Sequence, residues 1–202
     1  TQAELAVTLK PLETFEEAPL AGGTRAHGEV MVSSLATIYK KLRLETNENL
    51  GWGRIHLPEI ELHTTAYWLA VDPGAVSDWS RAELDVALVG AGRAMQTVAS
   101  ILLMSDPRDL GMVAQIRSPH AGCPVVYLYE SAPGGVGMAA RLFERHGELV
   151  DGARRLVASC PCDDGCPACT GPRGETGGNG RLLAERLLGL LGGDAGVGSR
   201  AA

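Results

Sequence analysis

The stretch SCPCDDGCPACTG, residues 159–171, contains four of the five cysteines in this chain of 202 residues. They are Cys160, Cys162, Cys166 and Cys169, with the spacing C-x-C-x3-C-x2-C. Disulfides explain this pattern poorly, because Cys160 and Cys162 are too close to pair and the four thiols converge on one point instead of bridging distant segments. The spacing therefore predicts a metal site.

Two kinds of metal site take four cysteines, a zinc ion and an iron–sulfur cluster. A single short loop suits one small ion better, so zinc is the favoured interpretation, and the cluster stays open. Four sulfurs around zinc leave no position for water or substrate, which predicts a structural role. A CxxC redox switch would leave two thiols unexplained. Cys123 stands apart, and we predict a buried thiol there.

The bulk composition predicts a globular protein of one domain or two small ones. The chain is 45% hydrophobic and has a net charge of −6. This charge argues against nucleic-acid binding through the overall electrostatic field of the protein, although a local basic face could still bind phosphates. No uncharged apolar run approaches the roughly 20 residues of a membrane span, so we expect no membrane contact and a cytoplasmic protein. The chain starts at Thr1 without a methionine, and we expect it to be a piece of something larger.

The segments before the cysteines predict an α+β fold that begins with an antiparallel β-unit. Residues 1–28 are mixed and polar, and we predict a connector with little regular structure there. From Val30 to Val71, alternating β-branched and aromatic residues predict strands, with a turn at 47–53 and a break at Pro58.

A central helix follows this β-unit. Ser80 and Glu83 form a capping-box pattern, and the apolar residues up to Met104 cover nearly all sides of the predicted helix. A hairpin over 112–130, helices up to 157 and over 181–191, and the four-cysteine zinc loop complete the fold class. The predicted organisation is a connector at 1–28, one domain at 29–191 with its zinc loop at 160–169, and a disordered tail at 192–202.

Other residues could carry chemistry, but each also has a structural explanation. The turn SAPGGVG, residues 131–137, could hold a phosphate or could serve close packing. Asp106, Asp109 and Glu130 could bind a second metal for nuclease chemistry, although a network of caps and turns is favoured. The five histidines are scattered without ligand spacing. The basic run at 40–43 and the pair at 154–155 leave open a DNA contact or a solvated face.

The order of three segments resembles the C-terminal domain of MrfA-type helicases, which are bacterial DEAD/DEAH-box DNA helicases of superfamily two named for mitomycin repair. The segments are LMSDPRDLG (103–111), VVYLYESAPGGVGMAARLFER (125–145) and SCPCDDGCPACTG (159–171), with ELHTTAYWLAV (61–71) before them. The likeness runs from about Val30 to Leu191. It implies an MrfA zinc-binding domain whose ligands are the four cysteines of the loop.

The resemblance implies a zinc-stabilised accessory domain of an ATP-dependent DNA helicase in DNA repair. ATP and Mg²⁺ would belong to a motor whose phosphate-binding and DEAD/DEAH motifs are absent from these 202 residues. The implied partners are helicase motor domains, in cis or in trans, and single-stranded DNA. The alternative is a stand-alone interaction module of a repair or phage-defence complex, without catalysis of its own.

Overall fold

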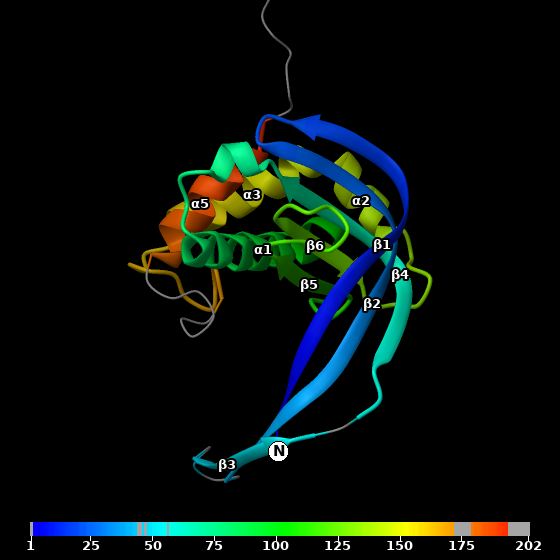
Figure 1. The fold of residues 1–202 in the computed structure, drawn as a ribbon. Coiled ribbons are helices and arrows are strands. Elements are labelled where there is room, and N and C mark those ends of the chain that lie inside the picture. Colours follow the sequence, from blue (N-terminus) through cyan, green and yellow to red (C-terminus); the bar gives the residue numbers. More distant parts are fainter. Residues whose placement is uncertain (1, 44–45, 47, 56, 172–178, 194–202) are drawn as a thin grey trace, which may run out of the picture.

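The computed structural model describes residues 2–43, 46, 48–55, 57–171 and 179–193. Six antiparallel strands form one sheet in the order β1-β2-β4-β6-β5, and β3 pairs with β2 beside this path. Figure 1 shows the curved sheet with the helices gathered on one side. The bounds are β1 Gln2–Leu20, β2 Gly23–Leu42, β3 Asn49–Arg54, β4 Ile60–Val71, α1 Arg81–Leu103, β5 Leu110–Gln115, β6 Val125–Glu130, α2 Met138–Glu144, α3 His146–Ser159 and α5 Gly180–Leu191, with a short 3₁₀ turn at Pro73–Val76. The predicted α+β class is confirmed.

The two faces of the sheet bury separate cores. Alternate residues of β4 point to opposite faces, so Tyr67 and Leu69 pack with the helices while Ala66 and Trp68 pack on the other side. The second core is enclosed because the edge strands β1 and β5 approach each other, and the Gln115 amide donates to the Leu9 carbonyl. Strand β6 is therefore covered on both faces, which explains its continuous apolar sequence VVYLY.

Helix α1 is the central helix that the sequence predicts. Its capping box forms as expected, with the Glu83 amide donating to Ser80 Oγ and the Ser80 amide donating to Glu83 Oε2. Strands β5 and β6 pack on one side of α1, and α3 and α5 pack on another. By length and composition this helix could cross a membrane, but its packing is that of a core helix.

Two predictions about the front of the chain are wrong. Residues 2–28 do not lack regular structure, because they form β1 and the start of β2. Register shifts at Glu4/Leu5, Pro11/Glu13 and Thr14/Glu16 interrupt the alternation in β1, and such bulges hide a strand from a period-two pattern. The predicted turn at 47–53 mostly forms β3 instead.

The back half follows the prediction more closely. Strands β5 and β6 form the expected hairpin, and the Leu-rich helix starts one residue early, at Gly180. The helical stretch before the cysteines divides at Arg145 into α2 and α3. Of the predicted tail, residues 194–202 lie outside the described part of the chain, and the predicted domain bounds of 29–191 stay a prediction.

Candidate metal centre

The four-cysteine loop begins where α3 ends. Cys160 caps α3 in an extended conformation, and the chain turns back at Gly165, whose φ of 111° favours glycine. A tight turn follows, in which the Cys166 carbonyl accepts from the amides of Cys169, Thr170 and Gly171 at 3.0–3.1 Å. The amide of Cys166 also points at Cys169 Sγ, 3.3 Å away. The two turns bring all four thiols to one side of the loop.

The sulfur positions match a single tetrahedral ion. The Sγ atoms of Cys160 and Cys166 are 3.6 Å apart, as are those of Cys162 and Cys169, and all four lie within 4.8 Å of one another. With Zn–S bonds near 2.3 Å, a tetrahedron has edges of about 3.8 Å. In a four-iron cluster each thiolate binds a different iron, which sets the sulfurs further apart than a shared ion does. The geometry therefore favours one ion, and the thiols are free rather than paired as disulfides.

The thiols of the loop differ in pKa. Burial and contacts with the thiols of Cys160 and Cys169 raise the pKa of Cys162 to about 12. A hydrogen bond from the Ala168 amide, with contact to the Cys160 thiol, lowers the pKa of Cys166 to about 7. Four such neighbours cannot all ionise next to one another unless a cation compensates their charge. A divalent ion supplies that compensation, and its binding must release protons.

The loop is anchored on α1 and α5. Cys169 and Thr170 are buried, and the Asp164 carbonyl accepts from the amide of Arg181 in the first turn of α5. A side chain at Gly90 of α1 would place its Cβ 3.0 Å from Ala184 and 3.4 Å from Thr170, so the absence of one lets α5 and the loop approach α1 closely. No pattern in the sequence indicates this contact. An ion here ties the end of α3 to the start of α5.

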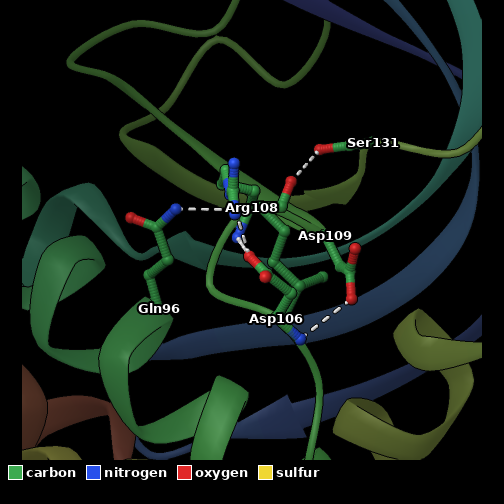
Figure 2. A network of polar contacts seen from close by, with 6 residues as sticks. Gln96, Asp106, Arg108, Asp109 and Ser131 are labelled. Carbon is green, nitrogen blue, oxygen red and sulfur yellow. Dashed lines mark hydrogen bonds and ion pairs between the residues drawn. The ribbon is translucent and has the colours of Figure 1, made fainter.

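The acidic residues that could have formed a second metal site serve the backbone instead. In Figure 2, Asp106 accepts from the Arg108 amide, Asp109 accepts from the Asp106 amide, and the Ser131 hydroxyl donates to the Arg108 carbonyl. Among the described residues, these carboxylates join no group of potential metal ligands. Glu130 is fully buried and also has other partners. The favoured prediction of a cap-and-turn network is confirmed.

The Glu130 carboxylate occupies the donors of the glycine-rich turn. It accepts from the amides of Val136 and Ala139 at 2.5 and 2.8 Å, and from the Thr65 hydroxyl at 2.6 Å. These amides are the donors that a phosphate would need at the start of α2. A side chain at Gly135 would collide with Thr65, so this glycine permits close packing. The structural interpretation of the turn is the correct one.

The remaining candidates lie away from the four sulfurs. Cys123 is half-buried just before β6, where burial raises the pKa of its thiol. His27 and His146 are buried, His63 and His120 are exposed, and His56 lies outside the described residues. His146 joins three elements, because its ring contacts the Tyr67 hydroxyl at 2.7 Å and the carbonyl of Leu191 at 3.0 Å.

Comparison with known proteins gives consistent matches. The family model described as MrfA Zn-binding domain matches residues 91–170. The chain is 40% identical over 191 residues to the uncharacterized ATP-dependent helicase YprA of Bacillus subtilis (strain 168), covering 95% of this chain and 25% of the relative. It is 21% identical over 126 residues to the ATP-dependent helicase HRQ1 of Saccharomyces cerevisiae, covering 56% of this chain and 12% of that protein.

Solved structures match over nearly the same length. The crystal structure of the DUF1998 helicase MrfA bound to DNA aligns with a TM-score of 0.76 and 38% identity, covering 93% of this chain and 25% of that one. Another crystal structure of the DUF1998 helicase MrfA aligns with a TM-score of 0.64 and 34% identity, covering 94% of this chain and 24% of that one. The chain thus spans about a quarter of the length of YprA and MrfA.

Proposed function

We propose that this chain, whose residues 91–170 match the MrfA Zn-binding domain, is the zinc-stabilised accessory part of an ATP-dependent DNA helicase that acts in DNA repair. The convergence of four thiols in a loop that joins α3 to α5 is the observation that carries this proposal. The match to helicases over nine-tenths of the chain supports the helicase context.

The zinc ion would be held by Cys160, Cys162, Cys166 and Cys169. Four protein sulfurs complete its coordination, so it supplies no catalytic chemistry and acts by fixing the loop. The loop is rich in glycine and proline and has little apolar surface of its own, whereas α1, α3 and α5 share a large core. The metal would replace the packing that the loop lacks.

The motor would lie in another part of the same polypeptide. This proposal follows from the length of the relatives, since the aligned region is one quarter of each helicase. ATP and Mg²⁺ would bind to that motor, which would be of the DEAD/DEAH-box kind, and the present domain would pack beside it along the path of single-stranded DNA. Such a protein would act on DNA in the cytoplasm.

Metal analysis of two matched variants tests the zinc site. Purified chain should contain one zinc ion, Cys169→Ser should lose most of it, and Cys123→Ser should keep it. A strong chelator should lower the melting temperature of the unmodified chain by about 10 °C or more, because a structural ion contributes several kcal/mol to the folded state. Metal-free protein with unchanged melting, or pairwise oxidised thiols, would contradict the proposal.

The proposal that this chain belongs to a helicase needs a separate test on the intact protein. The intact protein should unwind forked DNA only with ATP and Mg²⁺, and Cys169→Ser should impair unwinding more than Cys123→Ser does. An interaction module without catalysis predicts neither ATP hydrolysis nor unwinding by the intact protein.

A further inference from the structure

The far end of the β-sheet forms an arm that stands away from the helices. In Figure 1, β1 and β2 run beyond the body of the molecule, and β3 lies at their distant end. There β3 pairs with β2 from Ile38↔Arg54 to Leu42↔Asn49, and the start of β1 pairs with β2 near Lys40. We name the three-stranded segment formed by residues 38–43 and 48–55, with the start of β1, the arm tip.

The arm tip exposes a large aromatic side chain. Trp52 is 69% exposed and Leu50 is 54% exposed, and Trp52 shares one face of β3 with the exposed Arg54 because side chains alternate along the regularly paired part of the strand. On the other face, the Tyr39 ring lies directly on Gly53, where a Cβ would come within 3.0 Å of it. The Trp52 indole is therefore open to solvent on one face of β3, and the Tyr39 ring covers Gly53 on the other face.

The arm tip is also basic within an acidic chain. The segment 38–55 contains Lys40, Lys41, Arg43 and Arg54 against two glutamates, whereas the whole chain has a net charge of −6. Arg43 contacts Glu48 at 3.1 Å, and the Lys41 ammonium lies 5.9 Å from the centroid of the Tyr39 ring. Arg54 lies on the same face as the Trp52 indole, whereas Lys41 and Tyr39 lie on the opposite face of the arm.

An open indole beside an exposed arginine matches the chemistry of single-stranded nucleic acids. Unpaired bases stack on aromatic rings, and nearby Lys and Arg attract the phosphates. Paired bases inside a duplex do not offer their flat faces in this way. A protein partner fits less well, because the apolar centre of a stable interface is larger than one indole and one leucine and is depleted in charge.

We infer that the arm tip binds single-stranded nucleic acid, with Trp52 stacking on a base and Arg54, on the same face, attracting the phosphates, while Lys41 adds positive charge on the opposite face. This contact is separate from the metal loop and does not require the motor. An arm of this kind would hold a strand at a distance from the helical body.

Binding of fluorescent (dT)20 and (U)20 to the zinc-loaded chain, measured by anisotropy from 50 to 200 mM salt, tests the inference. Trp52→Ala should weaken binding about tenfold, while Trp52→Phe should retain most of it, since loss of a stacked base costs about 1–3 kcal/mol. Arg54→Ala should lower the slope of log affinity against log salt by about 0.7. The two oligonucleotides distinguish DNA from RNA as the source of the strand.

Two exposed residues outside the arm provide matched controls. Arg154→Ala removes a charge from α3, and Leu182→Ala removes an apolar side chain from α5 that is 63% exposed. Both should bind like the unmodified chain. The inference fails if the zinc-loaded chain does not bind at 50 mM salt, if Trp52→Ala binds within twofold of the original, or if Arg154→Ala weakens binding as much as Arg54→Ala. Zinc content and melting temperature, measured on each variant, keep this test distinct from that of the metal site.

Discussion

Replacing the buried Glu130 with glutamine should destabilise the fold although it changes only one oxygen into an NH₂ group. The carboxylate accepts three hydrogen bonds, from the Thr65 hydroxyl and from the amides of Val136 and Ala139. The hydroxyl can rotate and accept from an NH₂ group, but a backbone amide cannot. In either orientation of the new side chain, one of the two amides faces another donor.

The expected cost is about 2–3 kcal/mol. A hydrogen bond to a charged group contributes about 1.5–3 kcal/mol, and the lost negative charge at the start of α2 adds about 0.3–1 kcal/mol. Glutamine is easier to bury than a carboxylate, which offsets part of this loss. For a chain of this length, such a change lowers the melting temperature by about 4–10 °C.

Urea unfolding of zinc-loaded protein, followed by circular dichroism, measures this difference. Glu144→Gln is the matched control, because Glu144 lies on the same helix and is exposed. It should change the free energy of unfolding by less than about 0.5 kcal/mol. If Glu130→Gln is as stable as the control, the turn does not depend on a carboxylate and our account of its three donors is wrong.

Three further substitutions test other parts of the fold. Tyr67→Phe removes the hydroxyl that contacts the buried His146 ring, and urea unfolding should show a loss of about 1–2 kcal/mol; an equally stable variant would show that this contact adds nothing. Gly90→Val would bring a side chain within 3.0 Å of Ala184, so the melting temperature should fall by the equivalent of about 1–3 kcal/mol, and a chelator should remove zinc faster than from the unmodified chain. Ser80→Ala removes the cap of α1 and should cost about 1 kcal/mol in the same unfolding assay, whereas no loss would mean that the cap is dispensable.

The elements that sequence predicted best are those encoded by neighbouring residues. The start of α1 follows from Ser80 and Glu83, which contact each other across three positions. The β5–β6 hairpin likewise joins two adjacent apolar runs. Strand β1 was missed because its three register shifts break the alternation, and β3 was missed because Gly51 and Gly53 are typical of turns. Pairing with β2, rather than local preference, makes each of them a strand.

The candidate metal site was likewise predictable from the sequence only in part. Ten residues contain all four thiols, so spacing alone predicted a metal site and named its ligands. The choice between one ion and a cluster needed the sulfur–sulfur distances, which depend on how the loop turns at Gly165 and Cys166.

The sequence by itself determined the position of the metal loop, the central helix and the α+β class, because each depends on residues within a few turns of chain. Only the tertiary structure decided what holds the loop and what occupies the glycine-rich turn. Gly90 meets the loop residue Thr170, and Thr65 meets Glu130, across 80 and 65 positions. Contacts over such separations arise from the packing of the whole chain, and no local pattern records them.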